Sequence, residues 1–550
     1  MRNTRFVSRA FVSRVFVGRD FANRTFVNRA FMNRAIGTLL VLFVSVASLG
    51  AQRPAARKPV INAEIASMLA RVSAASMQGH LSFIASDLLE GRNTPSPGLD
   101  LAASYIAAQM RRAGLEPAGD DGYFQTANWL VAERDMDNFE FKIQSGGEAI
   151  NVSKDRVSLP PSGVLEMINA QAVKLDYKDS AATAAITTDQ IAGRVIVTEI
   201  ADYRREEGPR RMELFQAQSQ FLNRMQELKA RLVVSLDRSN PVGSGAAQGR
   251  LIDPENRSAR SVTSNVPLVT VHDPAALKLY DAMTAGATGA TVTVRLPEFR
   301  ERPVRLRNVA GLLRGADAAL KDTCVLLTAH YDHIGARPAA AGDGIYNGAN
   351  DDGSGTVAVI EIAAALATMK QRTRRSILFV TFFGEEKGML GSRYYGRHPI
   401  FPIEKTVADI NLEQVGRTDS DEGPQLATAS LTGFDYSDVG AVLKEAGGLT
   451  GIRVYKHERN SDAYFGRSDN QALADQGVPA HTLCVAFSYP DYHGVGDHWE
   501  KIDYSNMERV TRMVALAVVM IANNPREPKW NESNPKAARY LKAWQQRRAP

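Results

Sequence analysis

The spacing of apolar residues along the chain predicts a protein of alternating helices and strands. From residue 99 to 112, apolar side chains recur every three or four positions, which is the pattern of a helix with one buried face. The continuous apolar runs 324–328 and 376–383 have the length of buried strands, and the run 356–369 between them is typical of a helix. Strand, loop and helix alternate from residue 301 onward. We therefore predict a mixed, mostly parallel central sheet with helices on both faces.

The stretch 135–300 has a different texture and predicts a smaller inserted α/β domain. It alternates short strand-like runs with helix-like segments, and its single histidine, His272, has no dense cluster of acidic residues and histidines around it in the sequence. We assign no chemistry to this insert. The predicted parts of the chain are a signal peptide at 1–50, a core in two parts at 60–134 and 301–525, the insert at 135–300, and a basic tail at 526–550.

The positive charge of the chain is concentrated at its N-terminus. Residues 1–34 contain eight Arg and one Asp, a net charge of +7, so the rest of the chain carries −1 of the total of +6. This distribution argues against nucleic acid as a partner. The apolar run 35–49 ends in small residues, as in a secretory signal peptide, and is shorter than the ~20 residues of a membrane-spanning helix. We expect an exported protein, periplasmic or secreted, with no stable membrane insertion after signal removal, whether it starts at Met1 or Met32.

The chain contains only two cysteines, Cys324 and Cys484. Each lies inside an apolar, strand-like run, so we expect two buried free thiols, although export would permit a disulfide. Two cysteines are too few for a zinc site built on thiolates.

Residues with metal-binding side chains follow several of the predicted strands. Imidazole and carboxylate donors without thiolate suit zinc or another divalent ion in a hydrolytic site. Two ions about 3.5–4 Å apart need one carboxylate that contacts both, and this set supplies enough donors with one glutamate to spare. The candidates are His330 and Asp332 in AHYDHIG, Asp351 in NGANDDGSG, Glu385 and Glu386 in FFGEEKG, Glu413 in INLEQVGR, and His493 in YHGVGDHWEKID.

The adjacent Glu385 and Glu386 indicate a division of roles. One carboxylate is expected to bind metal and the other to take a proton from the attacking water. Asp332, two residues after His330, is in position to orient that imidazole. Three nearby residues are interpreted as ordinary or supporting groups: His333, Asp352 and His498.

These segments resemble the two-zinc aminopeptidases of the aminopeptidase Y and bacterial leucyl aminopeptidase type. The resemblance covers residues 63–122 and 308–522 and is carried by NVAGLL, AHYDHIG, NGANDDGSG, FFGEEKGMLGS, RSDNQAL and YHGVGDHWEKID. It implies a zinc-exopeptidase-like fold and a metallo-aminopeptidase that hydrolyses the first peptide bond of substrates with a free N-terminus. The insert is more loosely similar to a protease-associated domain.

The resemblance also implies a role for each candidate residue and a cofactor of two zinc ions per chain. Carried over position by position, Asp351 contacts both ions, Glu386 and His493 complete one site, His330 and Glu413 complete the other, Glu385 is the general base and acid, and Asp332 supports His330.

The sequence departs from the family pattern at two positions. The ligand in INLEQVG is usually Asp, whereas this chain has Glu413. The later SDH motif reads Ser468-Asp469-Asn470, so Asn470 replaces a family histidine near the substrate. The change at Glu413 leaves the metal spacing and affinity at that position open, and the change at Asn470 leaves the side-chain specificity of the enzyme open.

Three other functions remain open on the same fold. A glutaminyl cyclase would use a single zinc, and a carboxypeptidase would act at the opposite end of a peptide. A receptor-like binding protein, as in the transferrin receptor type, would have lost its metals. Because His330, His493, Asp351 and Glu385 are all present, a two-zinc aminopeptidase is favoured. A metal count would separate it from the cyclase.

Overall fold

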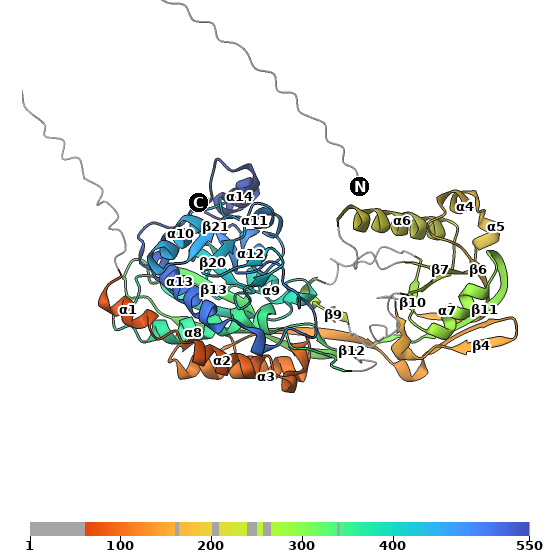
Figure 1. The fold of residues 1–550 in the computed structure, drawn as a ribbon, viewed down its shortest axis with the longest axis horizontal. Helices are drawn as coiled ribbons and strands as arrows, with labels where there is room; N and C mark the ends of the chain where they lie inside the picture. The colour runs from red at the N-terminus through yellow and green to blue at the C-terminus, as the bar shows by residue number, and fades with distance from the viewer. Residues whose placement is uncertain are drawn as a thin grey trace, which may run out of the picture. The chain divides into compact units, whose positions relative to one another are not determined.

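The computed structural model describes residues 61–159, 164–200, 208–238, 250–256, 266–337 and 342–548 (Figure 1). The predicted signal peptide at 1–50 lies outside these residues. Within the described ranges, none of the helices combines the length and the apolar character that a membrane crossing requires.

The larger sheet contains ten strands, and its central four run parallel. The strands are β1 (Glu116–Pro117), β2 (Phe124–Arg134), β9 (Arg250–Ile252), β12 (Phe299–Leu313), β13 (Cys324–His330), β16 (Ser376–Phe382), β17 (Thr406–Leu412), β20 (Thr428–Leu431), β21 (Arg453–Tyr455) and β22 (Ala480–Cys484). Their order is β21-β20-β22-β17-β13-β16-β12-β2-β9, with β1 beside β12. β22, β17, β13 and β16 are parallel, while β12 and β20 join them antiparallel. The predicted mixed α/β sheet is confirmed.

Alternate side chains of each strand point to opposite faces, so the sheet has two apolar faces. Helices cover both of them. In β13, Val325 and Leu327 belong to one core and Leu326 to another. The first core includes α1 (Ala63–Leu69), α2 (Ala74–Ile84), α3 (Pro97–Arg112), α8 (Gly355–Ala367), α10 (Val439–Thr450) and α13 (Tyr504–Asn523). The second includes α9 (Leu390–Arg397), α12 (Asn470–Ala474) and α14 (Ala538–Arg547). The helices predicted at 99–112 and 356–369 correspond to α3 and α8.

A separate eight-stranded sheet is formed within residues 140–296 and has its own apolar core. Its order is β4-β3-β11-β6-β7-β8-β10-β5. The strands are β3 (Glu140–Ser145), β4 (Glu148–Asn151), β5 (Val157–Ser158), β6 (Leu165–Lys174), β7 (Val195–Glu199), β8 (Leu232–Leu236), β10 (Leu268–Val271) and β11 (Gly286–Leu296). Its helices are α4 (Ser180–Ala185), α5 (Thr188–Ile191), α6 (Gly208–Glu227) and α7 (Pro274–Ala282). The domain boundaries at 135 and 300 stay a prediction.

Shorter elements complete the fold, and the two cysteines remain reduced. These elements are α11 (Asn460–Ala463), β14 (Gly335–Ala336), β15 (Ile345–Tyr346), β18 (Asp419–Ser420) and β19 (Gly423–Pro424). Cys324 in β13 and Cys484 in β22 are buried free thiols, as expected.

The C-terminal residues, predicted from the sequence as a basic tail at 526–550, pack onto the core. Trp530 and Tyr540 are only 3% and 4% exposed. Their rings stack with centroids 5.1 Å apart, and Nε1 of Trp530 donates to the carbonyl oxygen of Gly477. Burial of two large aromatic side chains holds the segment in place despite its basic charge. The described residues 526–548 are therefore part of the packed fold although they are basic.

Candidate functional site

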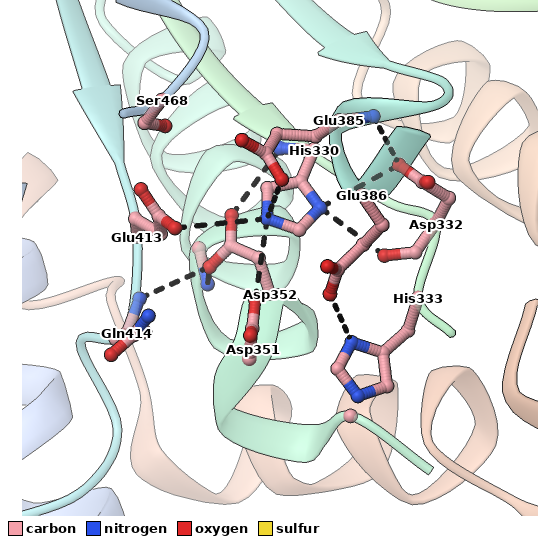
Figure 2. A network of polar contacts seen from close by, with 12 residues as sticks. His330, Asp332, His333, Asp351, Asp352, Glu385, Glu386, Glu413, Gln414 and Ser468 are labelled. Atoms are coloured by element: carbon pink, nitrogen blue, oxygen red, sulfur yellow. Dashed lines mark hydrogen bonds and ion pairs between the residues drawn. The ribbon is translucent and has the colours of Figure 1, made fainter. Parts of the chain in front are cut away.

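The predicted site residues gather where the parallel strands end. His330 is the last residue of β13, Glu413 directly follows β17, and Glu385 begins a helical turn just after β16. Asp351 lies in the turn Ala349–Ser354 that leads into α8, and its own backbone angles are not helical. In a parallel sheet the carboxyl ends of neighbouring strands share one edge, and loops there commonly form binding sites. Figure 2 shows these side chains turned toward the His330 ring.

The carboxylate of Asp351 stands between two histidines. Its Oδ1 atom lies 3.3 Å from Nε2 of His330, and its Oδ2 atom lies 3.1 Å from Nε2 of His493. Oε1 of Glu413 is 4.0 Å from Nε2 of His330, on the first side. Oε2 of Glu386 is 3.2 Å from Nε2 of His493, on the second. One carboxylate therefore joins two groups of imidazole and carboxylate donors, as a pair of metal ions requires.

The donor atoms of this site fit divalent cations. Those of His330, Asp351 and Glu413 lie within 4.8 Å of one another. Nε2 of His330 and Oε1 of Glu386 are buried without a hydrogen-bond partner among the residues that the structure describes. Such buried polar atoms are costly unless something binds them. Imidazole and carboxylate are also donors that zinc accepts.

Burial and crowded negative charge raise the pKa of two glutamates. Burial raises the pKa of Glu413 to about 7; the neighbouring Asp351 carboxylate adds to this effect, and His330 opposes it. Burial also raises the pKa of Glu385 well above its usual range, with His330 opposing and Glu413 reinforcing the shift. A cation in the site would relieve this repulsion.

The contact between Glu386 and His493 favours the charged form of both residues. Burial and the charge of Asp351 act to raise the pKa of Glu386, but contacts with His333 and His493 lower it to about 2. Burial acts to lower the pKa of His493, but Asp351 and Glu386 raise it to about 10. Glu386 therefore stays ionised at neutral pH, which is the state in which a carboxylate binds metal, whereas His493 has to release its proton to bind an ion.

Asp332 supports two of the predicted residues. Its Oδ1 atom accepts a hydrogen bond from the backbone N–H of Glu385 at 3.0 Å, and Thr94 donates to Oδ2 at 3.2 Å. Nδ1 of His330 makes a 3.2 Å hydrogen bond with the backbone oxygen of Asp332 and lies 3.6 Å from its carboxylate. Asp332 thus contacts His330, as expected from the spacing, and also holds the loop of Glu385.

Asp352 binds backbone groups from three segments around the site. Its carboxylate accepts from the N–H groups of His330 at 3.3 Å, Gly355 at 3.0 Å and Gln414 at 3.2 Å. This agrees with its interpretation as a supporting residue. His498, the third such residue, has its Nε2 atom 3.8 Å from Asp343.

Two supporting residues were not predicted from the sequence. Asp497 accepts hydrogen bonds from the backbone N–H groups of Asn350 at 3.0 Å and Asp351 at 3.2 Å. Arg92 is completely buried and donates to backbone carbonyls of the segments that carry His330 and Asp351. The available signals were two short strings that each contain a charged residue: GDHWEK, which includes Asp497, and DLLEGR, which includes Arg92.

The departure at Asn470 has a structural use. Its Nδ2 atom donates to the backbone oxygen of Phe465 at 3.0 Å, and its Oδ1 atom accepts from Thr482 at 2.8 Å. Asn470 is fully buried, so these bonds satisfy a polar side chain inside the fold.

Comparison with known proteins identifies relatives of the second core segment. Residues 308–518 match the model of peptidase family M28. Aminopeptidase YwaD of Bacillus subtilis is 26% identical over 251 residues, covering 44% of this chain and 50% of the relative. A probable glutamate carboxypeptidase, AMP1 of Arabidopsis thaliana, is 27% identical over 227 residues, covering 39% of this chain and 29% of that protein. The chain thus spans half or less of these relatives.

Solved structures share the fold of this chain. The structure of BSAP, a zinc aminopeptidase from Bacillus subtilis, aligns over 84% of this chain and 97% of its own, with a TM-score of 0.55 and 18% identity. At that identity the match establishes the shared fold and leaves the chemistry to the site residues.

Proposed function

We propose that this chain is a zinc-dependent aminopeptidase, because residues 308–518 match the model of peptidase family M28. It would hydrolyse the N-terminal bond of peptides whose α-amine is free. The observation that carries this proposal is the position of Asp351, whose two oxygens face His330 at 3.3 Å and His493 at 3.1 Å. The names of relatives such as aminopeptidase YwaD support the choice of reaction.

The same distances suit donors that share a zinc ion. Two donors about 2.0–2.2 Å from one ion lie about 3.3–3.6 Å apart at the tetrahedral angle. The contacts of Asp351 with both histidines, and of Glu386 with His493 at 3.2 Å, are at or just below the lower end of this range. His330, Asp351 and Glu413 would hold one ion, and Asp351, Glu386 and His493 the other. The 4.0 Å separation of Glu413 from His330 is the loosest of these contacts.

Glu385 is the proposed general base and acid. When bound, the zinc pair lowers the pKa of the attacking water and polarises the scissile carbonyl. Glu385 takes the proton of that water and delivers it to the leaving amine. Its Oε2 atom lies 4.0 Å from Nε2 of His330, and its side chain keeps 12% of its surface exposed, so it borders the site and remains open to substrate. Asp332 fixes its backbone through the 3.0 Å hydrogen bond.

A panel of aminoacyl amides, each with and without an N-acetyl cap, tests this function in the zinc-loaded protein. Hydrolysis of the free-amine forms alone is expected. Cleavage of C-terminal residues from capped peptides would favour the carboxypeptidase, which has support in the name of the Arabidopsis relative. Cyclisation of N-terminal glutamine with one bound zinc would favour the cyclase. Absence of all three activities from a protein that binds no metal would favour the receptor-like alternative.

Export is proposed from the sequence of the N-terminal segment alone, in which a basic stretch precedes the apolar run 35–49. N-terminal sequencing of the mature protein is expected to begin close to Gly50 or Ala51. An intact cytoplasmic chain that retains Met1 or Met32 would refute export. The insert at 135–300 is proposed to be a protease-associated-like domain.

A further inference from the structure

His333, interpreted from the sequence as an ordinary or supporting group, lies at the second metal group. It follows β13 by three residues, and its side chain is completely buried. Nδ1 of His333 lies 2.7 Å from Oε1 of Glu386, as the dashed line in Figure 2 shows. His333, Asp351 and Glu386 form a group whose donor atoms lie within 4.8 Å of one another.

The two oxygens of Glu386 contact different histidines. Oε1 lies against His333 at 2.7 Å, and Oε2 lies 3.2 Å from Nε2 of His493. The rings of His333 and His493 are 5.6 Å apart between centroids and meet at 72°. Two imidazoles therefore flank the same carboxylate, with Asp351 as the fourth member of the cluster.

Nδ1 of His333 and Oε1 of Glu386 approach each other closely without a regular hydrogen bond. Despite the 2.7 Å distance, neither atom has a hydrogen-bond partner in the described part of the chain. Nε2 of His330 faces Asp351 in the same unbonded manner. By contrast, Nδ1 of His330 makes a regular hydrogen bond with Asp332. Donors about 2.1 Å from one ion and at a right angle lie about 3.0 Å apart, so shared ligation of an ion would lengthen the 2.7 Å contact by about 0.3 Å.

A purely structural role does not explain why the His333 ring is buried. Both of its nitrogens lack a hydrogen-bond partner among the described residues. An unsatisfied buried polar atom costs about 1–3 kcal/mol. His481, another fully buried histidine, has both ring nitrogens bonded, to Ser437 at 2.6 Å and to the backbone oxygen of Thr432 at 2.8 Å. His333 therefore lacks what a buried structural histidine in this chain possesses.

We propose that His333 is a further ligand of the second metal ion, which would then be held by Asp351, Glu386, His333 and His493. The inference rests on the proposed two-zinc site and adds a residue to it. The first ion, at His330 and Glu413, has only one imidazole. Two imidazoles at the second position make that ion the more tightly held of the two. His493 is 39% exposed, whereas His333 is fully buried, so His333 provides the part of the site that solvent reaches least.

Zinc titration of the metal-free protein tests this assignment with His333→Ala, His333→Asn and, as a matched control, His481→Asn. If His333 is a ligand, both changes at position 333 raise the Kd of one zinc by more than 100-fold and leave the other unchanged. Residues that only orient a ligand typically contribute about 10–100-fold. His481→Asn is expected to bind two ions as the wild type does. Circular dichroism of the metal-free proteins checks that each variant is folded.

Three results would overturn the inference. Unchanged zinc affinity in both variants would show that His333 does not contact the ion. If His333→Asn binds like the wild type while His333→Ala does not, an amide donor suffices, and His333 orients Glu386 through a hydrogen bond. A wild-type protein that binds fewer than two ions would overturn the two-zinc proposal itself, and this measurement distinguishes that failure from the other two.

Discussion

Replacement of Arg92 by methionine is expected to lower the stability of the protein and its affinity for zinc. Nε of Arg92 donates to the carbonyl of Tyr331 at 2.8 Å, and Nη1 and Nη2 donate to Asn347 at 2.6 Å and Gly348 at 2.9 Å. A fourth bond joins Nη1 to Ile84 at 2.6 Å. Tyr331 is adjacent to His330, and Gly348 is three residues before Asp351. One side chain therefore connects the two segments that carry these proposed ligands.

The size of the destabilisation follows from the four backbone carbonyl oxygens that lose a hydrogen-bond donor in Arg92→Met. At about 1–3 kcal/mol for each unsatisfied buried group, the gross loss is about 4–12 kcal/mol. Removal of a buried charge recovers part of this, so we expect a net destabilisation of about 3–5 kcal/mol for Arg92→Met. Burial lowers the pKa of Arg92 to about 10, opposed by the nearby Asp332 and Asp497, so the guanidinium is charged at neutral pH.

Urea unfolding of the zinc-free and zinc-loaded proteins measures this effect. The loss is expected to be larger without zinc, because Arg92 is then a main source of positive charge near Asp332, Asp351, Asp352 and Asp497. Arg375→Met is the matched control: Arg375 is also buried and bonds to the carbonyls of Asn524 and Pro525. It should reduce stability without changing zinc affinity. A loss below about 1 kcal/mol for Arg92→Met, with unchanged zinc affinity, would refute the reasoning.

Three further predictions follow from the site and the core. Glu385→Gln should keep both zinc ions while turnover falls by about 10²–10⁴-fold, whereas Glu386→Gln should lose zinc and regain activity in part with excess zinc; the opposite pattern would reverse the two roles. Glu413→Ala should lower the zinc content measured by elemental analysis from two to one, and an unchanged content would remove Glu413 from the site. Burial lowers the pKa of His481 to about 4, against 6.5 when unfolded. The unfolded chain therefore binds the proton first as pH falls, and about 3 kcal/mol of stability should be lost between pH 6.5 and 4. In His481→Asn, unfolding midpoints measured across this range should depend less on pH, and an unchanged dependence would contradict the assignment.

The sequence by itself determined the type of fold and the main candidate residues. The apolar runs at 324–328 and 376–383 are buried strands because their continuous hydrophobicity needs cover on both faces, and they became β13 and β16. His330, Glu385 and Glu413 lie at or just after strand ends in the chain, and parallel strands bring such ends to one edge. These conclusions depend only on the order of residues along the chain and on the regular geometry of parallel sheets. They could therefore be reached from the sequence.

Only the tertiary structure decided which groups surround those candidates. The contact of Arg92 with Tyr331 joins residues 239 positions apart, and that of Asp497 with Asp351 joins residues 146 apart. The contact of Trp530 with Tyr540 places part of a basic segment in the core. The position of His333 against Glu386 likewise depends on how two loops pack. Charge, periodicity and motif spacing describe neighbours along the chain, whereas these contacts arise from the packing of distant segments, where the burial of polar groups requires a partner.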